Sequence, residues 1–419
     1  NYFFENGAKG LARGAPFGPQ INHDGRGHGC FHDLLRKRCI GDIDHEASLM
    51  SHRFTVEASR PDRSPGNPTS VSPMNEVVGI HHDNVTAWMV ENVGAEAPLS
   101  FELIAGGRSN LTFKVTDATG RRFALRRPPT SHVLPTAHDM VREHTVISAL
   151  APQGIPVATP LGLCVDETVN ERPFYVMDFV DGAILRDRRG AESAFDIGVR
   201  RSIGANLAQT LARLHDVDVV AAGLGELGRH EGYIERQLKR WRGQYEQMHV
   251  EGVDDGGIVV AVGDELAANI PAQQKVAVVH GDYRLDNTVL DTSGRVTAIL
   301  DWEICTLGDP MADLGLLLVY WAEPSDATEA LLGAAPTTAE GFANRQQVLE
   351  AYAAHSSLDV SHVAFYQAFG YWKLACILQG VFARYKGGAT AGDTGSVDAF
   401  PHHIKLLADT AKRTLDEGR

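Results

Sequence analysis

Eight consecutive residues, 280–287, combine side chains that could carry out phosphoryl transfer. They read His-Gly-Asp-Tyr-Arg-Leu-Asp-Asn and follow four small apolar residues, 276–279, which predict a strand. Asp282 could accept the proton of an acceptor hydroxyl, and the amide oxygen of Asn287 could bind a metal ion on a nucleotide. Arg284, between them, could neutralise charge on the transferred phosphoryl group.

A second carboxylate follows at the end of another predicted strand. Residues 296–300, Val-Thr-Ala-Ile-Leu, have the apolar and β-branched character of a strand and lead directly into Asp301. Asp301 lies 14 residues after Asn287, and a carboxylate at a strand end can hold Mg²⁺ through hard oxygen ligands. A His-Gly-Asp triplet alone would be a weak signal, because a buried histidine that bonds to its own loop gives the same triplet.

The ordered set of strand, His-Gly-Asp-x-x-x-x-Asn, strand and Asp resembles the aminoglycoside phosphotransferase family, whose members have a kinase-like fold and phosphorylate small molecules. The resemblance covers residues 76–386, about three quarters of the chain. Within it, Asp301-Trp-Glu stands where protein kinases carry Asp-Phe-Gly. The resemblance implies an α+β, two-lobed, protein-kinase-like fold, with ATP as the phosphoryl donor and Mg²⁺ as the cofactor.

The hydrophobic pattern divides the chain into three parts. Residues 1–73 hold nine Gly and six Pro and show no apolar periodicity, so we expect a mostly disordered leader that the chemistry does not need. Residues 74–181 predict a small β-rich N-terminal lobe, and residues 182–419 predict a larger, mostly helical C-terminal lobe. The clearest predicted elements are strands at 100–115, 121–126, 275–279 and 296–300, and helices at 136–150 and 233–248.

The resemblance also assigns a phosphate-binding residue upstream. Residues 123–126, Phe-Ala-Leu-Arg, stand at the position of the kinase Val-Ala-Ile-Lys strand, so Arg126 replaces the phosphate-contacting lysine. Glu143 lies three residues after Met140 and four before Ile147, on the apolar face of a predicted helix. A carboxylate there needs a cation, and we expect Arg126 to supply it. The alternatives are a solvated Arg126 at a sheet edge and an ordinary surface Glu143.

Two further segments resemble nucleotide-positioning parts of the family. One is the run Gly-Gly-Arg-Ser-Asn between two strand-like segments, whose backbone N–H groups would approach phosphates; a plain hairpin turn has the same sequence character. The residues concerned are Gly106, Gly107 and Ser109. The other is residues 174–182, which resemble the segment that links the lobes. There the backbone of Asp178 and Val180 would bond the adenine, although a buried strand without a ligand has a similar pattern.

Several other residues are expected to be structural. His280 is expected to form hydrogen bonds that hold its loop, and Asp309 and Asp313 are expected to brace the catalytic loop or cap the next helix. The cysteines at 164, 305 and 376 stand in apolar contexts and are expected to be buried small hydrophobic residues.

Composition excludes several classes of protein. The 419 residues carry 39 basic and 53 acidic side chains, a net charge of −14, which argues against a general nucleic-acid binder. No apolar run approaches the roughly 18 residues needed to cross a bilayer. Five widely scattered cysteines do not suggest a disulfide framework. We therefore expect a cytoplasmic globular enzyme with no nucleic-acid or membrane partner, and a homodimer is left open.

We expect an ATP- and Mg²⁺-dependent O-phosphotransferase that acts on a hydroxyl of a small molecule. Segments such as 123–129 and 365–385 are similar to the kinase-like domains fused to some acyl-CoA dehydrogenases, which suggests a hydroxyacyl thioester or another metabolic alcohol as the acceptor. An aminoglycoside antibiotic is the other acceptor considered. The alternative from a different class is a catalytically inactive, nucleotide-binding regulatory protein. It is disfavoured because Asp282, Asn287 and Asp301 are all present.

Overall fold

The computed structural model describes most of the chain from residue 77 onward. The described residues are 77–105, 110–130, 139–248, 250, 255–324, 326, 335–387 and 399–418. The expected leader, 1–73, and the expected phosphate-loop residues Gly106, Gly107 and Ser109 lie outside them. The described chain forms two compact units, an N-terminal unit that ends with Pro160–Phe179 and a C-terminal unit that holds Thr145–Thr159 and Val180–Arg419.

A five-stranded antiparallel sheet forms most of the N-terminal unit. Its strands are β1 (Ser100–Ala105), β2 (Leu111–Thr116), β3 (Arg122–Arg127), β4 (Pro160–Cys164) and β5 (Phe174–Asp178), in the order β1-β2-β3-β5-β4. The strand-like interval 100–115 contains two strands, β1 and β2, that pair with each other, as the two strand-like segments around residues 106–110 indicated. The turn between β2 and β3 is closed by Asp117, whose side chain accepts hydrogen bonds from the backbone N–H groups of Thr119 and Arg121.

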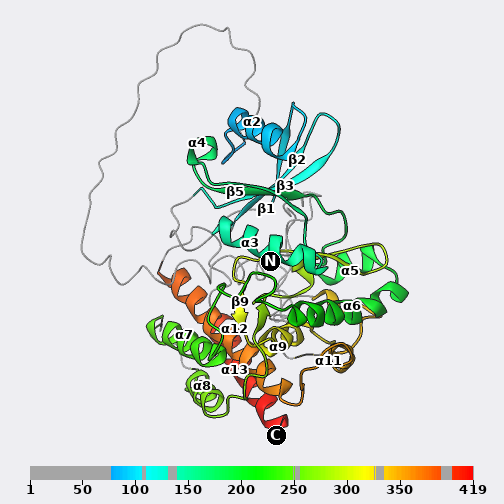
Figure 1. Ribbon diagram of the computed structural model, residues 1–419. Helices are drawn as coiled ribbons and strands as arrows, with labels where there is room; N and C mark the ends of the chain where they lie inside the picture. Colours follow the sequence, from blue (N-terminus) through cyan, green and yellow to red (C-terminus); the bar gives the residue numbers. More distant parts are fainter. Residues whose placement is uncertain are drawn as a thin grey trace, which may run out of the picture. The chain divides into compact units, whose positions relative to one another are not determined.

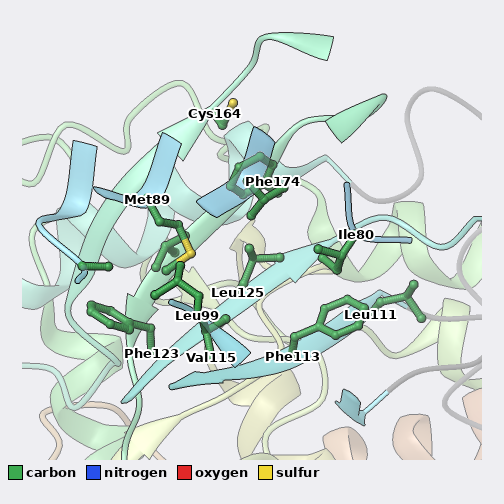
Figure 2. Close-up of a cluster of buried hydrophobic side chains, with 13 residues drawn as sticks. Ile80, Met89, Leu99, Leu111, Phe113, Val115, Phe123, Leu125, Cys164 and Phe174 are labelled. Atoms are coloured by element: carbon green, nitrogen blue, oxygen red, sulfur yellow. The ribbon is translucent and has the colours of Figure 1, made fainter. Parts of the chain in front are cut away.

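The core of the N-terminal unit lies between this sheet and helix α2 (His82–Val93). Strand side chains alternate between the two faces of a sheet, so every second residue of β2 and β3 reaches the core. Figure 2 shows Phe113 and Val115 of β2 and Phe123 and Leu125 of β3 in this cluster, together with Met89 of α2. All five side chains are fully buried.

The C-terminal unit is mostly helical (Figure 1). Its helices are α5 (Arg188–Ala194), α6 (Ile197–Asp216), α7 (Tyr233–Gln247), α8 (Ile258–Ala268), α9 (Met311–Tyr320), α11 (Arg345–Ala353), α12 (Val363–Lys386) and α13 (Phe400–Glu417). The β-rich first part and helical second part confirm the predicted α+β class. Within the described residues, no helix is both long enough and apolar enough to cross a membrane.

Helix α12 packs against α7, α8, α9 and α13. Its crossing with α9 depends on glycines. A Cβ atom on Gly315 of α9 would overlap the backbone of Tyr366 of α12, and one on Gly370 of α12 would lie 2.9 Å from Val319 of α9. The two helix backbones therefore approach each other more closely than side chains at these positions would allow.

The C-terminal unit also contains four short strands, which form two pairs, and one helical turn between them. Strand β6 (Ala277–Val279) pairs with β9 (Thr306–Gly308), and β7 (Thr288–Leu290) pairs with β8 (Val296–Ile299). A 3₁₀ turn, η3 (Leu285–Asn287), leads into β7. Helix α3 (Met140–Leu150) forms within the range 136–150 that the sequence predicted to be helical.

Removal of a core aromatic side chain should unfold the N-terminal unit more readily. Phe113 is fully buried, so Phe113→Ala should lower the free energy of unfolding by about 3–5 kcal/mol through lost burial and a cavity. Leu103 on the neighbouring strand β1 is 52% exposed, and Leu103→Ala should change it by no more than about 0.5 kcal/mol. Urea unfolding followed by circular dichroism measures both, and equal losses would show that this cluster is not the core.

Candidate active site

The loop after β6 is fixed by a carboxylate from helix α9. Asp313 accepts hydrogen bonds from the backbone N–H groups of His280, at 2.6 Å, and Gly281, at 2.8 Å. The ring of His215 lies 3.5 Å from the same carboxylate. Burial by itself raises the pKa of Asp313, but the hydrogen bond with His215 and the loop donors outweigh it, so its pKa lies below the usual value. The expected bracing role of Asp313 is confirmed.

His280 joins this loop to the strand that precedes Asp301. Its Nδ1 accepts a hydrogen bond from the backbone N–H of Asp282 at 3.2 Å, and its Nε2 lies 2.9 Å from the carbonyl oxygen of Leu300. A carbonyl can only accept, so Nε2 carries the proton and the ring is neutral. The expected structural role of His280 is confirmed. Asp309 caps the next helix, as expected: its side chain accepts a hydrogen bond from the N–H of Met311, the first residue of α9, at 3.1 Å. It also accepts one from the hydroxyl of Tyr366 at 2.7 Å.

Asp282 is held by two neighbours from its own loop. The side-chain amide of Asn287 donates hydrogen bonds to the carboxylate and to the carbonyl oxygen of Asp282, both at 2.8 Å. The Nε atom of Arg284 lies 3.2 Å from the other carboxylate oxygen. The Asp282 side chain remains 19% exposed, so a ligand can still reach it. The structure thus brings together the three residues that the sequence proposed for the catalytic loop.

Arg284 is more deeply buried than the sequence suggested. Its side chain is 3% exposed, its Nε lies 2.9 Å from Asp286, and its guanidinium stacks 4.7 Å from the ring centre of Tyr320. Burial by itself lowers the pKa of Arg284, but Asp282 and Asp286 outweigh it and raise the pKa above its ordinary value. Its contact with a transferred phosphoryl group stays a prediction. The sequence analysis missed Asp286 and Tyr320, although the alternation of 282, 284 and 286 was a readable signal for the first.

The amide oxygen of Asn287 is the atom that best fits a metal ion. It is buried and has no hydrogen-bond partner within the described part of the chain. Asp301 is separated from the end of β8 by Leu300 alone. The N–H of Leu300 donates to the carbonyl oxygen of Asn287 at 2.8 Å, so Asn287 and Asp301 lie at neighbouring ends of paired strands. Asp301 has a left-handed backbone, with φ of 67°. Strain of this kind often marks functional positions.

An amide oxygen and a carboxylate suit Mg²⁺, which usually takes one or two protein ligands and completes its shell with water and phosphate oxygens. Among the residues that the structure describes, no three His, Cys, Asp or Glu side chains gather as a metal site. The donor set of Asn287 and Asp301, one amide oxygen and one carboxylate, consists of the hard oxygen ligands that Mg²⁺ prefers.

The predicted pair in the N-terminal unit is confirmed. The Nε atom of Arg126 donates to Glu143 at 2.8 Å, and the two side chains are 10% and 1% exposed. The alternatives of a solvated arginine and a surface glutamate are therefore wrong. Two further donors to the Glu143 carboxylate were missed, the amide of Asn110 at 2.7 Å and the hydroxyl of Tyr175 at 3.0 Å.

The remaining predicted residues have less distinctive surroundings. The Asp178 side chain accepts a hydrogen bond from Arg121 at 3.2 Å, and Val180 is half-buried. The proposed bonds from their backbones to adenine stay predictions. Cys164, Cys305 and Cys376 are buried and free, as expected.

Residues 100–353 match the family model described as the phosphotransferase enzyme family. A crystal structure from Ralstonia eutropha JMP134, provisionally assigned as an aminoglycoside phosphotransferase, is 33% identical with a TM-score of 0.67 and covers 79% of this chain and 98% of its own. Choline kinase from Cryptosporidium parvum shares the fold, with a TM-score of 0.54, 12% identity and coverage of 80% and 95%. The predicted kinase-like fold is confirmed.

Curated relatives include two longer proteins. Acyl-CoA dehydrogenase family member 10 from Mus musculus is 31% identical over 78% of this chain and 31% of its own length. Acyl-CoA dehydrogenase family member 11 from Gallus gallus is 33% identical over 74% of this chain and 40% of its own length. The chain therefore spans about a third to two fifths of the length of these relatives.

The Arg126–Glu143 pair should be strongly coupled. Arg126→Met leaves a buried carboxylate without its cation and should cost about 3–5 kcal/mol of unfolding free energy. The double variant Arg126→Met, Glu143→Gln should cost about 1–3 kcal/mol less than the sum of the two single changes. The exposed pair Arg121–Asp178, with side chains 45% and 40% exposed, is the control and should show coupling below about 1 kcal/mol. Strict additivity at the buried pair in urea unfolding would contradict this arrangement.

Asp313 should stabilise the folded chain in a pH-dependent way. Asp313→Asn should cost about 1.5–3 kcal/mol at pH 7, because two N–H groups and His215 lose a charged acceptor. The folded-state pKa of Asp313 lies below its ordinary value of 3.8, so the carboxylate stabilises the fold above about pH 4. The difference between wild type and variant should therefore shrink as the pH falls below that value.

Thermal melting between pH 3 and 8 measures this difference, and Asp216→Asn is the control. The Asp216 side chain is 80% exposed and pairs with Lys275 at the surface, so its variant should change stability by no more than about 0.5 kcal/mol. A constant difference between wild type and Asp313→Asn at every pH would show that the carboxylate charge does not hold the loop.

Proposed function

Because the chain belongs to the phosphotransferase enzyme family, we propose that it transfers the terminal phosphoryl group of ATP to a hydroxyl group of a small molecule. The observation that carries the proposal is the arrangement around Asn287. Its amide nitrogen fixes the carboxylate of Asp282, while its buried amide oxygen has no partner within the described residues and lies at the strand end next to Asp301. One side chain thereby links a candidate base to a candidate metal site.

Asp282 is the proposed base. Asn287 and Arg284 each hold one oxygen of its carboxylate, which fixes its orientation, and the side chain remains reachable. A carboxylate held in this way can align an acceptor hydroxyl and take its proton at an Oδ atom. Arg284 balances the charge of the loop carboxylates and is the nearest cation for a group transferred beside Asp282.

Asn287 and Asp301 are the proposed magnesium ligands. When bound, Mg²⁺ supplies positive charge to the phosphate oxygens of the nucleotide. The role of the chain is to present the buried amide oxygen and the carboxylate in fixed positions. The backbone hydrogen bond from Leu300 to Asn287 and the strained conformation of Asp301 both serve that purpose.

The N-terminal unit contributes the proposed nucleotide-binding residues except Val180, which is the first residue of the segment Val180–Arg419 of the C-terminal unit. Glu143 accepts three hydrogen bonds and orients Arg126, which we propose contacts the phosphates of ATP. Backbone N–H groups of the residues before β2 are proposed to bind phosphates, and backbone groups at the end of β5 and just after it are proposed to bind adenine. These residues are Gly106, Gly107, Ser109, Asp178 and Val180.

The acceptor is proposed to be a metabolic alcohol, with a hydroxyacyl thioester ahead of an aminoglycoside. Support comes from the curated relatives, which are named acyl-CoA dehydrogenases and extend well beyond the matched segment. When two catalytic segments belong to one chain, they often act on related molecules, so a segment joined to an acyl-CoA dehydrogenase suggests a hydroxylated acyl chain as the acceptor. A panel of hydroxyacyl thioesters, other alcohols and aminoglycosides, screened for an ATP-dependent mass gain of one phosphoryl group, separates these acceptors.

Asp282 and Asp301 should fail in different ways. Asp282→Asn should bind Mg·ATP almost normally and lose about 10²–10⁴-fold in phosphoryl transfer, because only the base is removed. Asp301→Asn should lose both turnover and the Mg²⁺ dependence of ATP affinity, because a metal ligand is removed. Calorimetric ATP titrations with and without Mg²⁺ measure the binding, and turnover is measured with the acceptor found in the panel.

Asp416→Asn is the matched control, since Asp416 is an exposed aspartate that pairs only with Lys412 on its own helix among the described contacts. It should match wild type in both measurements. If Asp282→Asn abolishes Mg·ATP binding and Asp301→Asn leaves it unchanged, the two roles are assigned wrongly. If the wild-type chain binds Mg·ATP but transfers no phosphoryl group and hydrolyses no ATP, the regulatory alternative replaces the enzyme.

A further inference from the structure

Two buried glutamines lie where the C-terminal end of α7 meets α12. Gln244 of α7 is 3% exposed, and Gln379 of α12 is 1% exposed. Both amide atoms of Gln244 and the amide oxygen of Gln379 have no hydrogen-bond partner within the described residues. The Gln379 nitrogen donates to the carbonyl oxygen of Met248 at 2.9 Å. Buried polar atoms are nearly always hydrogen-bonded, so three such atoms together need an explanation.

One edge of the Arg384 guanidinium is buried near the two glutamines. Arg384, in the last turn of α12, has its Nε and Nη2 atoms buried without a hydrogen-bond partner in the described part of the chain. These two N–H groups form one edge of the guanidinium, the fork that binds two oxygens of a carboxylate or phosphate in parallel. Burial of such a fork is unfavourable unless an anion or other acceptors satisfy it.

Gly380 lets these groups come together against the backbone of α12. A Cβ atom built on it would lie 2.8 Å from Nε2 of Gln244, 2.9 Å from Sδ of Met248 and 3.9 Å from Nη1 of Arg384. The amide and the guanidinium therefore border the same spot. Gly380 stands inside a helix, where alanine would be favoured, and its backbone is not in the left-handed region. Its lack of a side chain therefore lets the Gln244 amide and the Met248 sulfur pack directly against the helix backbone.

We propose that Arg384, Gln244 and Gln379 form a binding site for an oxyanion, the phosphate or carboxylate group of a small molecule. The Nε and Nη2 fork of Arg384 binds two of its oxygens, and the Gln244 amide nitrogen, held against Gly380, donates to an oxygen of the same group. The two glutamine oxygens accept from hydroxyl or amide donors of the same ligand. None of these residues belongs to the catalytic loop, so the site stands independently of the proposed phosphotransfer.

The test follows the Arg384 side chain directly. In the full chain labelled with ¹⁵N-arginine, the Arg384 Nε–H signal is identified by its loss in Arg384→Lys. Titration with inorganic phosphate and, separately, with acetate at constant ionic strength should shift this signal saturably. Gln244→Leu should weaken the binding by about 10- to 100-fold, since a hydrogen bond to a charged ligand is lost.

Two glycine variants form a matched pair. Gly380→Ala places a methyl group where the Gln244 amide and the Met248 sulfur now lie. Both are ends of flexible side chains and can move aside, so the variant should displace the Gln244 donor and abolish the saturable shift without loss of the fold. Gly243→Ala, on α7, meets nothing within 4 Å and should bind as wild type does. Arg240→Met removes an exposed arginine from α7 and controls for net charge. Thermal melting of each variant confirms that it is folded.

The two titrations identify the source of the anion. Tighter binding of phosphate assigns the site to a phosphorylated molecule, and tighter binding of acetate assigns it to a carboxylate. Either outcome supports the proposal, and neither depends on ATP turnover. A signal that does not respond to either anion, or that responds equally in wild type and Gly380→Ala, would overturn it.

Discussion

The carboxylate of Asp313 is the group on which the candidate active site depends most. A loop in a protein interior must satisfy its backbone N–H groups, and here one buried side chain accepts from two consecutive ones. The backbone of His280 is fixed in this way, and its ring is hydrogen-bonded to the backbone N–H of Asp282 and to the carbonyl oxygen of Leu300, the residue before Asp301. The candidate base and the candidate metal ligand therefore depend on α9 as well as on the loop that carries them.

The candidate site also holds several charged groups close together. Asp282, Asp286 and Asp301 surround Arg284 closely enough to raise its pKa, and three carboxylates with one guanidinium leave a formal charge of −2. This charge equals that needed to neutralise one divalent cation. Removal of Arg284 would thus leave three carboxylates in mutual repulsion, a different problem from the loss of a phosphate contact. Its burial makes sense as part of this balance.

Short sequence patterns predicted the candidate site residues better than they predicted the residues that hold them in place. The motif at 280–287, the strand before Asp301 and the helical spacing around Glu143 were all readable, because each lies within one short segment. The partners of Glu143 were not, since Asn110 and Tyr175 reach it only through the register of β2, β3 and β5. Asp313 was expected to brace the loop, but its bond with His215 spans 98 residues and could not be predicted. The pairing of β1 with β2 agrees with the two strand-like segments recognised on either side of residues 106–110.

The glycine crossing between α9 and α12 has a mechanical meaning. With Gly315 against the backbone of Tyr366, and Gly370 close to Val319, neither helix can slide along the other without a clash. Tyr366 also bonds to Asp309, just before α9 begins. Helix α12 runs for 24 residues, about 36 Å at the usual rise, and ends with the turn that holds Arg384. Helix α12 is thus fixed to α9 near its N-terminal end. We expect a displacement of its C-terminal end along the helix axis to move α9 as well.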